Sequence, residues 1–215
     1  MRPVICMITD RKRLRSGGDA AFVERVAAAA RAGVHLIQIR ERDLEGGPLT
    51  ALVEACIEAV RSTAARIIVN DRLDVALAAG AHGVHLRRDS IPAQQVRRIA
   101  PPGFLVGRSV HSREAAAQAA RDGGLDYLIF GPVFATQSKP GVVPAGLARL
   151  ADAAAASPIP VLGIGGMSPE RGGEVVRTGA AGIAAMGLFM DPPCEALSNV
   201  VRELSQTFDT ASALP

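Results

Sequence analysis

The sequence predicts an α/β protein with the (β/α)8 barrel (TIM barrel) fold, and three observations lead to this prediction. Short apolar segments alternate with Ala-rich segments of helical spacing, which indicates a parallel sheet with crossover helices. The last two predicted strands both run into glycine, as the phosphate-binding loops of such barrels do. Four similar stretches each end a helix at glycine and enter a strand, at intervals of about two strand–helix units; these glycines are Gly33, Gly80, Gly123 and Gly179.

The chain contains eight expected strands, and this number favours a closed barrel over an open sheet. In chain order the strands are Val4–Thr9, Leu36–Ile39, Arg66–Val69, Gly83–Leu86, Phe104–Val110, Tyr127–Phe130, Ile159–Ile164 and Gly182–Met186. The helices between them are Ala20–Ala32, Pro48–Ser62, Asp74–Ala79, Ala93–Ile99, Arg113–Arg121, Gly146–Ala156 and Glu170–Arg177. We expect one barrel domain over residues 1–205, followed by a polar tail of small residues that frays from Gln206 to Pro215.

The composition narrows the classes of function. The chain has 215 residues, enough for the core of one domain, and a net charge of +3 with charged residues spread along it. This balance argues against nucleic acid or a membrane as a partner. The three cysteines lack metal-binding spacing, which predicts reduced thiols of a cytoplasmic protein. The apolar segment at the start is short and is followed directly by charged residues, so we expect no signal peptide. An oligomer is compatible with the sequence.

The segment Ile159–Met167 is the first candidate for phosphate binding. Its apolar strand runs into Gly165 and Gly166, and Ser168-Pro169 then starts a helix. Glycines let backbone N–H groups approach an anion, which a helix N-terminus also favours. The next strand reaches Gly187. Either stretch alone is explained as a tight turn, but together they predict that Gly165, Gly166 and Gly187 bind a phosphate group.

Functional residues of a (β/α)8 barrel lie at the carboxyl ends of the strands. Gln38 and Arg40 alternate along the second strand and therefore face the same side, where a buried charge needs an anion or an ion pair such as Glu41. Asn70 and Asp71 end the third strand and suit either Mg²⁺ or a helix N-cap.

Two later strand ends also carry polar residues. His111 follows the fifth strand, and we interpret it either as a helix cap or hydrogen-bonded core histidine, or as a group that transfers protons near neutral pH. His85 lies on an apolar strand and is predicted to be structural. The loop from Gly131 to Gly141 is predicted to be an anion-binding flap over the barrel mouth; its polar side chains include Thr136, Ser138 and Lys139.

Together these residues resemble the thiamin phosphate synthase and thiazole tautomerase (TenI) family over nearly the whole chain. The resemblance is carried by IQIRER (Ile37–Arg42), Val69–Leu86, GRSVHS (Gly107–Ser112), DYLIFGPVFATQSK (Asp126–Lys139) and IGGM (Ile164–Met167). It implies a (β/α)8 barrel that acts on a thiazole phosphate.

The two branches of this family imply different chemistry. A synthase joins hydroxymethylpyrimidine pyrophosphate to the thiazole phosphate and releases pyrophosphate, with Mg²⁺ and cations stabilising the leaving group. A tautomerase shifts protons on a carboxylated thiazole phosphate and needs an acid–base group but no metal. The residues that match the synthase pattern are Gln38, Arg40, Asn70, Asp71, Ser109, Thr136, Ser138 and Lys139.

The sequence departs from the synthase pattern at two places. Arg42 stands where the family has lysine, and the two residue types bind phosphate differently. After Leu86 synthases carry Gly-Gln-x-Asp, whose Asp is the second Mg²⁺ ligand; here Arg87 and Arg88 precede Asp89, so the carboxylate is displaced by one residue. The IRER and GRSVHS motifs are closer to the tautomerase, in which the histidine at the position of His111 transfers the proton.

We therefore favour a thiazole tautomerase that needs no cofactor. In this hypothesis His111 and Arg40 are catalytic, and the residues that bind the substrate and its phosphate are Gln38, Arg42, Ser109, Thr136, Ser138, Lys139, Gly165, Gly166 and Gly187. The alternative is a thiamin phosphate synthase with Mg²⁺ on Asn70, Asp71 and Asp89. A third hypothesis is a non-catalytic sensor that binds thiazole or thiamin phosphate and regulates a partner.

Overall fold

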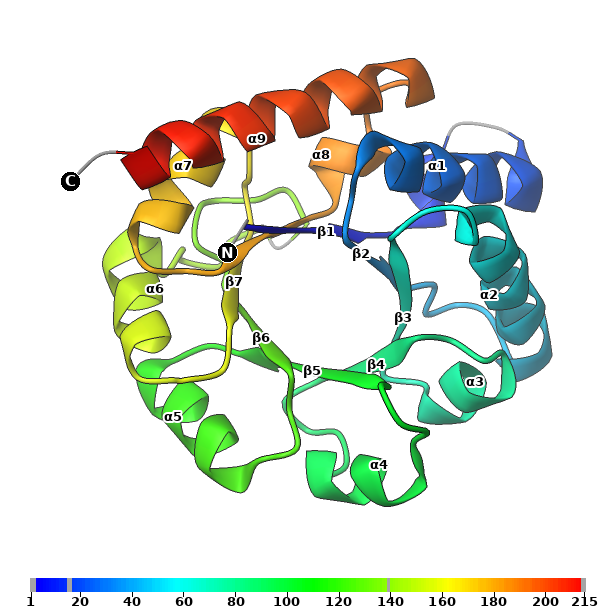
Figure 1. Ribbon diagram of the computed structural model, residues 1–215, viewed down its shortest axis with the longest axis horizontal. Coiled ribbons are helices and arrows are strands. Elements are labelled where there is room, and N and C mark those ends of the chain that lie inside the picture. Colours follow the sequence, from blue (N-terminus) through cyan, green and yellow to red (C-terminus); the bar gives the residue numbers. More distant parts are fainter. Residues whose placement is uncertain (1–2, 15–16, 139, 214–215) are drawn as a thin grey trace.

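The computed structural model describes residues 3–14, 17–138 and 140–213 and confirms the predicted barrel. Eight parallel strands pair in chain order, and the pairing of β8 with β1 closes the ring (Figure 1). The strands are β1 (Val4–Ile8), β2 (Leu36–Ile39), β3 (Arg66–Asn70), β4 (Gly83–Leu86), β5 (Leu105–Val110), β6 (Tyr127–Phe130), β7 (Val161–Ile164) and β8 (Gly182–Ala185).

Helices surround this ring on its outside (Figure 1). The α-helices are α1 (Gly18–Ala32), α2 (Gly46–Val60), α3 (Leu73–Ala78), α4 (Ala93–Ile99), α5 (Arg113–Asp122), α6 (Gly146–Ala155), α7 (Pro169–Arg177), α8 (Gly187–Met190) and α9 (Leu197–Ala213). Two short 3₁₀ helices, η1 (Arg11–Arg13) and η2 (Cys194–Ala196), lie in the connections. Across the described ranges, no helix is long and apolar enough to cross a membrane.

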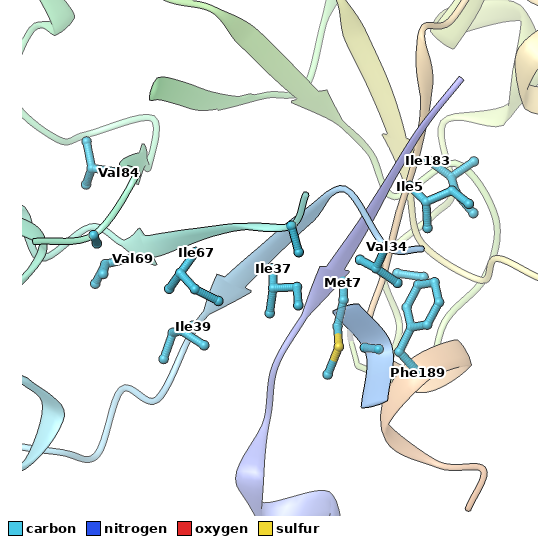
Figure 2. Close-up of a cluster of buried hydrophobic side chains, with 14 of the residues drawn as sticks. Ile5, Met7, Val34, Ile37, Ile39, Ile67, Val69, Val84, Ile183 and Phe189 are labelled. Atoms are coloured by element: carbon cyan, nitrogen blue, oxygen red, sulfur yellow. The ribbon is translucent and has the colours of Figure 1, made fainter. Parts of the chain in front are cut away.

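The main hydrophobic core lies between the outer face of the strands and the helices. Met7, Ile37 and Ile67 project into it from successive strands, and they are fully buried (Figure 2). Parallel strands covered by helices on one face and by the barrel interior on the other bury both faces, so their sequences are apolar throughout rather than alternating. For this reason the short apolar runs in the sequence predicted the positions of the strands.

A second apolar layer fills the interior of the barrel. Tyr127 of β6 is its largest member, and it fits because residue 107 on the neighbouring strand β5 is glycine: a Cβ there would overlap the tyrosine ring. The buried members of this interior layer are Cys6, Ile8, Leu36, Ile68, Tyr127, Ile129, Leu162 and Ala184. Polar residues occupy the inward positions nearer the carboxyl ends of the strands, where the candidate site lies.

The expected frayed tail is corrected by the structure, because α9 continues the fold from Leu197 to Ala213. Phe208 and Ala211 are buried within the range that we expected to fray. With Leu204 they form an apolar stripe at helical spacing, which the polar residues between them hide. This stripe packs on α7, where Gly172 has no side chain: a Cβ there would lie 2.9 Å from the Leu204 Cδ2.

Candidate active site at the barrel mouth

A cavity of about 770 Å³ opens at the carboxyl ends of the strands. Its volume is in the range of small-molecule sites. Eleven of the predicted site residues line it: Gln38, Arg40, Arg42, Asn70, Ser109, His111, Thr136, Ser138, Gly165, Gly166 and Gly187. Asp71 and Asp89 do not line it, and Lys139 lies outside the described residues.

The charged side chains around the cavity are mostly cationic. Two acidic residues, Asp10 and Asp191, line it, against five arginines, which are Arg13, Arg40, Arg42, Arg87 and Arg171. Low-dielectric walls lined by one sign of charge concentrate ligands of the opposite sign. The cavity therefore suits a substrate with several negative charges.

The glycines after β7 are held close to the loop that follows β6. Gly165 and Gly166 have φ angles of +105° and +63°, which side-chain-bearing residues rarely adopt. A Cβ on Gly165 would also lie 2.7 Å from the Pro132 Cβ. The loop is fixed there because the N–H groups of Val133 and Phe134 donate to the Ile164 and Gly165 carbonyls, at 2.7 and 3.2 Å.

A guanidinium group that we did not predict completes this side of the cavity. Arg171, in the first turn of α7, donates through Nη1 to the Gly166 carbonyl at 2.5 Å. Its Cζ lies 4.7 Å from the centre of the Phe134 ring. Ser168 caps the helix as predicted, because its hydroxyl accepts the Arg171 N–H. The glycine turn, the helix N-terminus and Arg171 together form an anion-binding environment.

Arg13 and Asp191, which also line the cavity, form an ion pair that we did not predict. Arg13 Nε and Nη2 donate to the two carboxylate oxygens of Asp191, at 2.7 and 2.6 Å. The hydrogen bond to Asp191 raises the pKa of Arg13. The two residues are 178 positions apart, so no local pattern in the sequence could link them.

Arg40, at the end of β2, has no anionic partner among the described residues. Both carboxylate oxygens of its neighbour Glu41 already accept hydrogen bonds, one from the Thr9 hydroxyl at 2.6 Å and one from the Arg11 N–H at 2.9 Å. This arrangement excludes Glu41 as the partner of Arg40. Burial lowers the pKa of the Arg40 guanidinium, and the nearby positive charge of Arg42 lowers it further. A half-buried cation without a direct ion pair favours a bound anion.

A buried hydrogen-bonded chain underlies the centre of the cavity. His85 Nδ1 lies 3.2 Å from the Tyr127 hydroxyl, and Nε2 lies 2.9 Å from the Ser109 hydroxyl. His85 Nδ1 is the acceptor available to the Tyr127 hydroxyl among the described residues, so Tyr127 donates to it. His85 Nε2 then donates to Ser109, whose own hydroxyl proton is free to point at a ligand. His85 is buried, as its place on an apolar strand suggests, but it also lines the cavity and orients Ser109.

The burial of His85 predicts a loss of stability in acid. Desolvation lowers the pKa of His85 to about 3, and Arg108 contributes to the shift. Below the unfolded-state pKa of about 6.5, the unfolded chain takes up a proton that the native His85 does not. We expect the free energy of unfolding to fall by about 2 kcal/mol from this site between pH 7 and pH 5. Urea unfolding at both pH values, in wild type and His85→Gln, measures it; equal losses in both proteins would contradict the assignment.

His111 lies beside the cavity in a defined tautomer. Its Nδ1 is 2.7 Å from the Gly131 carbonyl oxygen, which can only accept, so Nδ1 carries the proton and Nε2 of the neutral ring is an acceptor. His111 does not cap α5; Ser112 does, by accepting the Ala115 N–H at 3.1 Å. The helix-cap interpretation of His111 is therefore wrong, and the ring is available for proton transfer.

The proposed Mg²⁺ ligands are not arranged around an open position. Asn70 lines the cavity and its Oδ1 accepts from Gln38 Nε2 at 3.4 Å. Both carboxylates, Asp71 and Asp89, are instead in contact with Arg87. Among the residues that the structure covers, no group of three His, Cys, Asp or Glu side chains could hold a metal ion. These residues do not fit a carboxylate-bound Mg²⁺ at this rim. Neither Asn70 nor Asp71 caps α3 with its side chain.

Known proteins resemble this chain over most of its length. A family model described as thiamine monophosphate synthase matches residues 5–189. A thiamine-phosphate synthase of Roseiflexus castenholzii is 43% identical over 193 residues, which are 89% of this chain and 83% of that protein. One of Chlorobium luteolum is 38% identical over 208 residues, with 95% and 94% covered. The solved structure of a thiamine phosphate pyrophosphorylase from Pyrococcus furiosus is 31% identical, with a TM-score of 0.83 over 98% of this chain and 97% of that one.

Proposed function

The chain belongs to the thiamine monophosphate synthase family, and from this premise we propose that it is a thiamin phosphate synthase. Relatives with 38% and 43% identity that cover most of the chain are named synthases. They support the alternative from the sequence better than the tautomerase that the IRER and GRSVHS motifs favoured. The substrates are then hydroxymethylpyrimidine pyrophosphate and a thiazole phosphate.

The observation that carries this proposal is the separation of two anion-binding regions. The first comprises Arg40 and Arg42 beyond β2 and Arg87 beyond β4. The second comprises the glycines and Arg171 beyond β7, with Gly187 beyond β8. In the closed ring, β4 is four strands from β8 and three from β7, and β2 is three strands from β7 and two from β8, so the two regions occupy different arcs of the rim. A synthase holds a pyrophosphate and a phosphate at once, which requires two such regions, whereas one thiazole phosphate requires one phosphate grip.

The reaction assigns a role to each region. The C–O bond between the pyrimidine methylene and the pyrophosphate breaks, and its electron pair leaves with the pyrophosphate. A new C–N bond forms between that methylene and the thiazole nitrogen. Arg40 and Arg42 stabilise the charge that develops on the leaving group. Backbone N–H groups at Gly165, Gly166 and Gly187 hold the thiazole phosphate, which places the ring nitrogen for attack.

Other residues that line the cavity suit the heterocycles. Ile129, Ile164 and Met186 line it with apolar surface. Ser109 presents a hydroxyl whose proton is free, because His85 occupies its acceptor side. A heterocyclic ring with acceptor nitrogens fits this combination of apolar walls and one oriented donor.

The experiment supplies both substrates to the purified chain, with and without Mg²⁺, and measures product. We expect thiamin phosphate and one equivalent of pyrophosphate, with a rate that saturates in each substrate. The tautomerase would be supported by the absence of thiamin phosphate together with proton exchange on the carboxylated thiazole phosphate. In that case the exchange should disappear in His111→Ala, because the free His111 Nε2 is the acceptor beside the cavity.

A further inference from the structure

At the rim between β3 and β4, Arg87 of the first anion-binding region contacts two carboxylates that have no role in the reaction described above. Arg87 Nε lies 2.9 Å from Asp71 Oδ2, and Arg87 Nη2 lies 3.5 Å from Asp89 Oδ2. Arg87 lines the cavity, whereas the two carboxylates do not. The guanidinium of Arg87 therefore occupies the position between Asp71 and Asp89 that a metal cation would otherwise take.

The backbone fixes this arrangement. Asp71 has a φ of +64°, rare for a residue with a side chain, and its N–H donates to the His85 carbonyl at 2.9 Å. Ser90 closes the turn after β4, because its hydroxyl accepts the Arg87 N–H at 2.9 Å and donates to Asp71 Oδ1. Both oxygens of Asp71 are thus engaged by the segment that carries Arg87. The guanidinium is oriented before any ligand binds.

Part of the guanidinium remains available to a ligand. The Arg87 side chain is 50% exposed, and its Nη1 has no hydrogen-bond acceptor among the described residues. A guanidinium has five N–H donors in a rigid fork that matches phosphate oxygens. Arg87 and its two carboxylates carry a net charge of −1, and Arg40 and Arg42, which also line the cavity, each add a positive charge.

We propose that Arg87 binds the pyrophosphate group and provides the positive charge that a divalent cation on Asp71 and Asp89 would otherwise bring to this rim. The two carboxylates then orient the guanidinium instead of binding a metal. This inference rests on the proposed synthase function, because pyrophosphate is the group that this reaction releases. It predicts pyrophosphate binding that does not depend on Mg²⁺.

The test is calorimetric titration of inorganic pyrophosphate into the full chain, in EDTA and in excess Mg²⁺. Wild type should bind in EDTA, and Arg87→Gln should bind about tenfold or more weakly, the effect of losing a charge-assisted hydrogen bond. Arg88→Gln is the matched control, because Arg88 is exposed and does not line the cavity. It should change the Kd by less than about twofold. Mg²⁺ should restore part of the affinity of Arg87→Gln, since Asp71 and Asp89 are then free.

Two results would overturn the inference: wild-type binding that appears only when Mg²⁺ is added, or Arg87→Gln binding equal to wild type in EDTA. Arg87→Lys retains the charge without the fork and should bind with intermediate affinity, which guards against a folding defect in Arg87→Gln. Wild-type turnover is measured in parallel. If the wild type forms thiamin phosphate but Arg87→Gln binds pyrophosphate as tightly as wild type, this inference alone is contradicted. If pyrophosphate binding depends on Arg87 but the wild type forms no thiamin phosphate, the synthase function alone is contradicted.

Discussion

Replacing Arg40 with glutamine is expected to lower kcat/KM for thiamin phosphate formation by about 100- to 1000-fold, the cost of removing one preorganised donor from a developing anion. The side chain is half-buried at the end of β2 and lines the cavity. Because Arg40 has no ion-pair partner among the described residues and lies near Arg42, its charge is unfavourable without substrate. The free energy of unfolding of Arg40→Gln should therefore equal or exceed that of wild type.

Steady-state kinetics and urea unfolding of the same preparation measure both effects. Arg61→Gln is a suitable control, because Arg61 is an exposed arginine on the outside of the barrel whose side chain is 79% accessible. It should leave kcat/KM unchanged. A destabilised Arg40→Gln protein with near-normal activity would show that Arg40 is a structural residue after all.

Replacing Phe208 with alanine is expected to lower the free energy of unfolding by about 3–5 kcal/mol, the usual effect of deleting a buried aromatic ring. Phe208 is 2% exposed and packs against Gly172 of α7, where a Cβ would lie 3.2 Å from the Phe208 Cε1. Thr207, beside it, donates to the Pro169 carbonyl at 2.9 Å. The end of α9 therefore anchors the helix that follows the Gly165–Gly166 turn.

The midpoint of urea unfolding measures this loss, and KM for the thiazole phosphate should stay near the wild-type value wherever the protein is folded. Asp209→Ala is the control, since Asp209 is exposed on the same helix, and it should change stability by less than about 0.5 kcal/mol. If Phe208→Ala were as stable as Asp209→Ala, the tail would not be part of the folded domain.

Most of the fold could be predicted from the sequence because each strand is buried on both faces. A short apolar run such as Val161–Ile164 is enough to identify a strand of this kind, and glycines indicate where helices end. The end of α9 was missed because Leu204, Phe208 and Ala211, which face the core there, are separated by polar neighbours. Local composition indicated a tail, whereas tertiary packing on α7 decides the helix.

The lining of the site was predictable to the extent that strand ends determine it. Arg40 and Ser109 point inward because alternate residues of a strand do. Contacts between distant segments were not predictable: Arg13 with Asp191, and His85 with Tyr127, depend on ring closure and on the space at Gly107. The contact of Arg87 with both carboxylates depends on the left-handed backbone of Asp71, which no pattern in the sequence indicates.

Simultaneous binding of two anions is the most direct test of two separate regions at one barrel mouth. Thiazole phosphate is titrated by calorimetry into the chain already saturated with inorganic pyrophosphate. We expect one thiazole phosphate per chain, with a Kd that changes little with pyrophosphate concentration, because the two regions occupy different arcs of the rim. An apparent Kd that rises in proportion to the pyrophosphate concentration would mean that both anions compete for a single site.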